Sequence, residues 1–169
     1  HTFGLRSHLN RFSHVVINVS DLDRAVEFYE ATLPVRRLAR INGPVQTYRG
    51  LGIDRGQCRG WVLENKKDVA PPGDLIAEFP ARRLHLIEWP TPKPVGAPYA
   101  EANHVGIYRQ NELVSNLDAA YKNVIAHGVR PYGEPSRIIL TPEGFGVTVF
   151  AYREPDGNTL EMIGAETAA

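Results

Sequence analysis

Glu161 is the residue of this chain whose surroundings point most clearly to chemistry. It lies within a short apolar segment, Thr159-Leu160-Glu161-Met162-Ile163, soon after the turn-forming pair Asp156-Gly157. Removing an ionised carboxylate from water costs several kcal/mol unless a cation or several hydrogen bonds compensate it. The sequence therefore predicts a compensating partner for Glu161, and three histidines are the best candidates.

These three histidines lie in apolar segments of the same kind. His14 and His104 each head an alternating apolar segment, and His85 lies inside a third one, Leu84-His85-Leu86-Ile87. Two imidazoles and a carboxylate suit Fe(II), Mn(II), Co(II), Ni(II) or Zn(II), and a three-ligand set leaves positions open for a substrate. Because a single histidine at the start of a strand is more often structural, the metal prediction depends on these residues converging.

The alternation of side chains predicts the face of the sheet on which each residue lies. Successive side chains of a strand point to opposite faces, so His14 shares a face with Asn18, and His104 with Tyr108. The opposite faces are more uniformly apolar and should pack under helices; they carry Val15, Ile17, Leu84, Leu86, Val105, Ile107, Leu160 and Met162. The three histidines and Glu161 would then converge on the free side of the sheet.

Two helices and their flanking strands follow from the apolar spacing. One helix should start at Leu22, after Ser20 and Asp21 as capping candidates, and another at Leu117, after Ser115 and Asn116, with Gly128 placed to end it. Strand-like runs follow each helix, at 35–41, 58–63 and 83–89 in the first half and at 137–140, 147–152 and 159–163 in the second. The order is strand, helix and three strands, twice.

The two halves also echo each other, which indicates an internal duplication. His14-Val15-Val16-Ile17 matches His104-Val105-Gly106-Ile107, and Leu84-His85-Leu86-Ile87 matches Leu160-Glu161-Met162-Ile163. We therefore expect a first βαβββ module over 11–90, a proline-rich connector over 91–101 and a second βαβββ module over 102–165. The modules can pair within one chain or be exchanged between the subunits of a homodimer.

Composition argues against several classes of partner. The chain has 169 residues, of which 43% are hydrophobic, enough for a core in one functional unit. Its formal net charge is zero, so neither nucleic acid nor an anionic membrane is an expected partner. Cys58 is the only cysteine, and no segment is long and apolar enough to span a membrane. We expect a cytoplasmic protein that binds a small-molecule substrate.

The chain resembles the vicinal oxygen chelate superfamily, which includes glyoxalase I, bleomycin-resistance proteins and type I extradiol dioxygenases. The resemblance rests on the paired βαβββ pattern, on His-Val-Val-Ile-Asn-Val-Ser-Asp-Leu-Asp-Arg-Ala-Val-Glu-Phe-Tyr at 14–29, and on Glu-Pro-Asp-Gly-Asn-Thr-Leu-Glu at 154–161. It implies an α+β fold in which two tandem βαβββ modules form a U-shaped, open, eight-stranded mixed sheet, the glyoxalase-like fold.

The resemblance also implies a set of metal ligands. In this superfamily they come from the first and last strands of the modules, so His14 matches the first-strand ligand, His104 its equivalent in the second module, and Glu161 the last-strand carboxylate. His85 occupies the fourth position, where glyoxalase-like members usually carry glutamate, and is either a ligand or a hydrogen-bond donor behind the ligands. One divalent transition metal (Fe, Mn, Co, Ni or Zn) is the expected cofactor.

Lyase or isomerase chemistry is the function that we expect first. The metal would bind vicinal oxygens of a small carbonyl compound and stabilise its enolate, while a base moves the carbon-bound proton. Glu161 would serve as both ligand and base. Asn18 and Tyr108 share faces with proposed ligands and are candidate substrate contacts.

Two alternatives stay open. A non-haem Fe(II) dioxygenase would use the same two histidines and one carboxylate, but ring-cleaving members of the superfamily have a tyrosine where Ala151 stands here and a histidine within 142–144. A metal-free, drug-sequestering binding protein would use the cleft between the modules without a reaction. Such relatives generally lack the ligand set that this chain retains.

Overall fold

The computed structural model describes residues 14–66, 83–99, 103, 105–107, 109–142 and 144–164. The first module contains β1 (His14–Asn18), α1 (Leu22–Thr32), β2 (Val35–Asn42), β3 (Gln46–Tyr48), the 3-10 helix η1 (Arg49–Leu51), β4 (Ile53–Asn65) and β5 (Arg83–Thr91). The second contains β6 (Arg109–Val114), α2 (Leu117–Ala126), β7 (Ser136–Ile139), β8 (Gly146–Arg153) and β9 (Thr159–Gly164). The α+β class with two modules is therefore confirmed.

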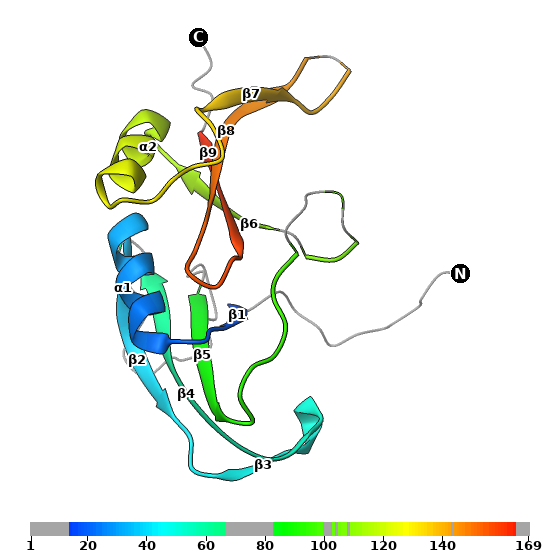
Figure 1. Cartoon of the computed structure of the whole chain (residues 1–169). Coiled ribbons are helices and arrows are strands. Elements are labelled where there is room, and N and C mark those ends of the chain that lie inside the picture. Colours follow the sequence, from blue (N-terminus) through cyan, green and yellow to red (C-terminus); the bar gives the residue numbers. More distant parts are fainter. Residues whose placement is uncertain are drawn as a thin grey trace, which may run out of the picture.

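The strands form two mixed sheets. The first has five strands in the order β1-β5-β4-β2, with β3 paired to β4, and the second has four in the order β6-β9-β8-β7. In each sheet the first strand of the module runs parallel to its last strand, and the other pairs are antiparallel. Within the described ranges no pairing joins the sheets, so the expected eight-stranded sheet is divided in two and β3 is additional. Both helices lie on the same side of the sheets (Figure 1).

Both helices begin at the capping residues that the sequence indicates. The side chain of Asp21 accepts a hydrogen bond from the backbone N–H of Arg24 at 3.1 Å, and that of Asn116 accepts one from Ala119 at 2.9 Å. Each cap satisfies an N–H group that has no partner within its own helix. At the other end of α2, Gly128 adopts a φ of 75°, which residues with a side chain rarely adopt.

One hydrophobic core joins the two modules. Phe28 on α1 packs against Tyr152 on β8 with ring centroids 6.0 Å apart, and the Asn123 side chain on α2 donates to the Ala31 carbonyl at 2.9 Å. Four of the residues predicted to face the helices belong to this core: Ile17, Leu86, Leu160 and Met162. Val15 does not, because it lies on the edge strand β1 with 51% of its surface exposed. The modules therefore share a single buried interior.

The first strand of the second module lies later in the chain than the alternating run at 102–108 predicts. The strand β6 begins at Arg109, and the described residues 105–107 are outside any strand. Gly106 has a φ of 134°, which interrupts the extended backbone. Val105 and Ile107 are 94% and 88% exposed, so the prediction that they pack under a helix was wrong. Only two residues, 115 and 116, separate β6 from α2, which gives the tight strand-to-helix connection seen in the first module.

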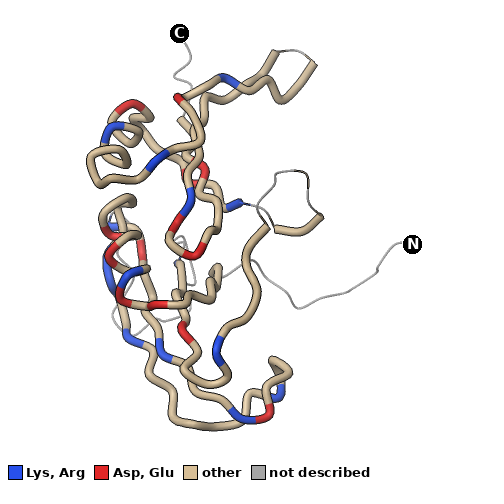
Figure 2. The backbone as a smooth tube through the Cα atoms, viewed as in Figure 1, with Lys and Arg blue, Asp and Glu red and all other residues tan. Residues whose placement is uncertain are grey.

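Both modules contain basic and acidic residues (Figure 2). Basic and acidic residues are interspersed along the chain, as Figure 2 shows. In the part of the chain that the structure describes, no helix combines the length and hydrophobicity needed to cross a membrane.

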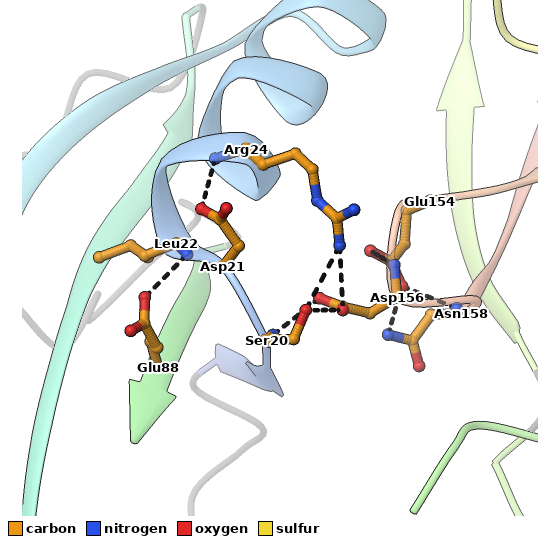
Figure 3. Close-up of polar contacts among 8 residues, drawn as sticks. All are labelled: Ser20, Asp21, Leu22, Arg24, Glu88, Glu154, Asp156 and Asn158. Carbon is orange, nitrogen blue, oxygen red and sulfur yellow. Dashed lines mark hydrogen bonds and ion pairs between the residues drawn. The ribbon is translucent and has the colours of Figure 1, made fainter. Parts of the chain in front are cut away.

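The turn between β8 and β9 joins the second module to the start of α1 (Figure 3). Glu154 accepts hydrogen bonds from the backbone N–H groups of Asp156 at 2.9 Å and Asn158 at 2.7 Å, which close the turn. Asp156 in turn accepts hydrogen bonds from the backbone N–H of Ser20 at 2.9 Å and from its hydroxyl, and pairs with Arg24 at 3.4 Å. The Glu-Pro-Asp-Gly-Asn motif therefore has a structural role, which is to dock one module on the other.

We expect Asp156→Ala to lower the free energy of unfolding by about 1–2 kcal/mol, because it removes hydrogen bonds to a charged group at this junction. Urea denaturation of the purified variant measures the change. Asp54→Ala is the matched control, since the Asp54 side chain is 99% exposed and should change stability little. Equal stability of the two variants would contradict a docking role for Asp156.

Candidate functional site

Strand register places His85 and Glu161 at equivalent positions of the two modules. Each lies on the last strand of its module, opposite the third residue of the parallel first strand. His14 is the first residue of β1, and Arg109 is the first residue of β6. His14 and His85 therefore form a pair on the first sheet, and Arg109 and Glu161 form its counterpart on the second.

The His14–His85 pair brings two imidazoles into contact. Their ring centroids are 4.0 Å apart and their planes differ by 14°. The Nε2 atom of His85 is buried and has no hydrogen-bond partner among the described residues. Burial, together with nearby His14 and Arg83, lowers the pKa of His85 from 6.5 to about 4. His85 is therefore uncharged at neutral pH, which is the form of imidazole that binds metals.

The Arg109–Glu161 pair compensates the buried carboxylate. The Glu161 side chain is 8% exposed, and its Oε2 atom accepts a hydrogen bond from Arg109 Nε at 2.9 Å. The sequence argument predicted a partner for Glu161 but did not identify Arg109. One signal was available: Arg109 precedes the capping residue Asn116 by the same number of residues as His14 precedes Asp21. By its distance in sequence from the helix cap, Arg109, and not His104, corresponds to His14.

A row of charged side chains crosses the first sheet and ends at His14. Arg36, Glu64, Arg83 and His14 lie opposite one another on β2, β4, β5 and β1. Arg36 donates to Glu64 Oε1 from Nε at 3.0 Å and from Nη2 at 2.6 Å, and the Glu64 side chain is fully buried. The row holds two arginines and one glutamate, so the formal charges of these three side chains sum to one positive charge.

The other residues singled out in the sequence have varied places. The Asn18 side-chain oxygen accepts a hydrogen bond from Trp89 Nε1 at 3.0 Å, and Asn18 is otherwise exposed. His104 and Tyr108 lie outside the described residues. Glu88, on the helix side of β5, accepts hydrogen bonds from the Leu22 backbone N–H at 2.9 Å and from Arg59 at 2.8 Å, so it anchors the start of α1 (Figure 3).

Among the described residues the structure brings two of the predicted ligands together, His14 and His85, and leaves Glu161 with Arg109. No group of three or more His, Cys, Asp or Glu side chains gathers in those ranges in a way that could hold a metal ion. The unpartnered Nε2 of His85 beside a second imidazole fits one part of a transition-metal site. The carboxylate of such a site is engaged with the guanidinium, so the fit of the described donors is partial.

Wild-type stability should fall as pH falls from about 6.5 to about 4, partly because of His85. In this window the unfolded chain binds a proton at His85 that the folded protein does not, so acid favours unfolding. The contribution is at most about 3 kcal/mol, and less because His85 is only partly buried. Urea denaturation at several pH values should show a shallower pH dependence for His85→Asn and an unchanged one for the exposed control His127→Asn. The same pH dependence of the free energy of unfolding in all three proteins would contradict the assignment of this effect to His85.

Comparison with known proteins is consistent with this geometry. The family model described as the Glyoxalase/Bleomycin resistance protein/Dioxygenase superfamily matches residues 11–162. No curated protein sequence matches the chain.

Solved structures share the fold at low sequence identity. A glyoxalase family protein from Bacillus cereus is 19% identical, with a TM-score of 0.71 over 95% of this chain and 97% of that one. A glyoxylase/bleomycin resistance protein/dioxygenase domain from Frankia sp. EAN1pec is 16% identical, with a TM-score of 0.56 over 94% of this chain and 99% of that one. Glyoxalase I from Zea mays is 15% identical, with a TM-score of 0.63 over 94% of this chain and 46% of that one. With two βαβββ modules and a family match over nearly its whole length, the chain belongs to the Glyoxalase/Bleomycin resistance protein/Dioxygenase superfamily.

Proposed function

We propose that this chain is a metal-dependent enzyme that binds a small carbonyl substrate through vicinal oxygens and catalyses a lyase or isomerase reaction through an enolate. The observation that carries the proposal is the His14–His85 pair, in which two imidazoles touch and one has a buried ring nitrogen without a partner among the described residues. His14 lies on the first strand of its module and His85 on the last, and the resemblance to the superfamily implies metal ligands on these strands. Family membership supports the general type of activity.

In this proposal His14 and His85, together with His104, would hold a divalent transition metal, while Glu161, which is engaged with Arg109, would act as the base. A bound divalent ion supplies Lewis-acid polarisation of a substrate oxygen. Glu161 is the proposed base. Its Oε2 is held by Arg109, while its Oε1 accepts no hydrogen bond from the described residues, so Oε1 is the atom that receives the carbon-bound proton.

One observation favours a metal-free binding protein as the second candidate. The ion pair with Arg109 compensates the negative charge of Glu161 without a metal. A protein that only sequesters a small molecule would need compensation of this kind. A ring-cleaving dioxygenase ranks lower, because Ala151 lies opposite Glu161 on β8 and offers only a methyl group at that place. Metal content distinguishes the first two candidates.

Protein purified without added metal should contain about one transition metal ion per chain, and His85→Ala should lose most of it, because an imidazole ligand is removed. Elemental analysis by mass spectrometry measures the ratio. The control is His127→Ala, which removes an exposed histidine at the end of α2 and should retain the metal. A wild-type protein that is metal-free and cannot be loaded with Ni(II), Co(II), Zn(II), Mn(II) or Fe(II) would instead support the binding protein.

Enolate chemistry makes a prediction that needs no knowledge of the final product. In D₂O and without oxygen, the wild type should catalyse exchange of the carbon-bound proton next to the carbonyl of a bound substrate, detected by proton NMR. Glu161→Gln should slow this exchange by about 100-fold or more, in the range found for loss of a general base. Oxygen consumption that depends on Fe(II), without such exchange, would favour the dioxygenase.

A further inference from the structure

We propose that Arg109 binds a carboxylate group of the substrate, so that the carbonyl compound is a small 2-oxo or 2-hydroxy acid and not a neutral molecule. This inference rests on the proposed function and adds the substrate class. It concerns a residue that the sequence argument did not consider, at the position in the second module that His14 holds in the first.

The geometry of Arg109 leaves one side of its guanidinium available. Its Nε atom donates to Glu161 at 2.9 Å, and neither terminal nitrogen has a hydrogen-bond partner among the described residues. The side chain is 44% exposed, whereas that of Glu161 is 8% exposed. The two terminal nitrogens of an arginine form a planar fork that matches the two oxygens of a carboxylate. The Nε side of the Arg109 guanidinium is therefore held by Glu161, and its two terminal nitrogens are available to a ligand.

The charges around Arg109 favour a single negative charge in the ligand. Arg109, Thr159 and Arg153 lie opposite one another on β6, β9 and β8. Glu161 lies on the same face as Thr159, two residues further along β9, so the two arginines face one carboxylate. Among the described residues, the formal charges of Arg109, Arg153 and Glu161 sum to one positive charge. A carboxylate monoanion neutralises that excess, whereas a phosphate dianion would exceed it.

The position of Arg109 also links the proposed carboxylate site to the proposed base, Glu161. A carboxylate held at the tip of Arg109 lies next to the carboxylate of Glu161, because the same guanidinium contacts both. The carbon beside the bound carboxylate then lies near Glu161 Oε1. In the proposed step a C–H bond breaks, at C2 in a 2-hydroxy acid or at C3 in a 2-oxo acid, whose C2 carries no hydrogen. The proton passes to Oε1, and the electron pair moves onto the oxygen of the adjoining carboxyl or keto group, where the guanidinium stabilises the enolate charge.

The test compares a charged and an uncharged probe. Binding of pyruvate, hydroxyacetone and dihydroxyacetone phosphate to the wild type is measured by isothermal titration calorimetry or ligand-observed NMR. We expect pyruvate to bind at least tenfold more tightly than hydroxyacetone, which corresponds to about 1.4 kcal/mol. Dihydroxyacetone phosphate should bind more weakly than pyruvate.

The variants are chosen so that loss of folding does not imitate loss of binding. Arg109→Gln alone leaves Glu161 buried without compensation, so the informative protein is the double variant Arg109→Gln/Glu161→Gln, which keeps the net charge of the pair. It should bind pyruvate and hydroxyacetone equally, with an unchanged unfolding transition or circular dichroism spectrum. Arg55→Gln, which removes an exposed arginine on β4, is the control and should keep the wild-type preference for pyruvate.

The outcomes separate this inference from the function on which it rests. Equal binding of pyruvate and hydroxyacetone to the wild type, no binding of pyruvate, or a preference that survives in the double variant would overturn the role of Arg109. Tighter binding of dihydroxyacetone phosphate, which carries a phosphate and no carboxylate, would overturn the assignment of a carboxylate. Each of these results can occur in a protein that contains its metal, so none of them by itself contradicts the proposed enzyme. A metal-free protein that still prefers pyruvate through Arg109 would contradict the proposed enzyme and would support the carboxylate site.

Discussion

A carboxylate that is buried on a β-strand needs a positive charge beside it, and this constraint organises the second module. Glu161 is 8% exposed and receives its only hydrogen bond from the described residues through Arg109. Breaking such a pair by removing one partner costs more than the pair itself contributes, because a charge then stays buried without compensation. The register between β6 and β9 is what brings the two side chains together.

The two modules use the same strand positions for different chemistry. In the first module these positions hold two imidazoles in contact, and the pKa of His85 is lowered to about 4, chiefly by burial. In the second they hold a cation and an anion that neutralise each other. The neutral His85, whose Nε2 has no partner among the described residues, is suited to a metal, and an arginine whose terminal nitrogens have no partner there is suited to an anionic group. The proposed site combines both functions on the face of the sheets turned away from the helices.

Local signals in the sequence predicted much of this fold. The helix starts at Leu22 and Leu117 were correct because capping by Asp21 and Asn116 is a local interaction. The equivalence of His85 and Glu161 agrees with the strand register, because it came from a repeated apolar pattern on two buried strands. The prediction failed where an alternating apolar pattern did not coincide with the position of a strand.

The failure concerns the start of the second module. The run that begins at His104 alternates as a strand should, yet the positive φ of Gly106 and the short connection to α2 place the strand after it, at residues with a weaker apolar pattern. The Arg109–Glu161 contact follows from that shift. Its two strands are distant in the sequence, so its signal is indirect: Arg109 stands at the same distance from the cap Asn116 as His14 does from Asp21. The ligand role of His104 stays a prediction.

The coupling between Arg109 and Glu161 is the quantity that tests this account most directly. A double-mutant cycle in the free energy of unfolding, with Arg109→Gln, Glu161→Gln and both together, isolates it. We predict that Arg109→Gln alone is clearly destabilising, that the second substitution restores part of the loss, and that the coupling free energy is at least about 1 kcal/mol. Effects that add to within about 0.3 kcal/mol would show that the two side chains do not interact, and would contradict the account.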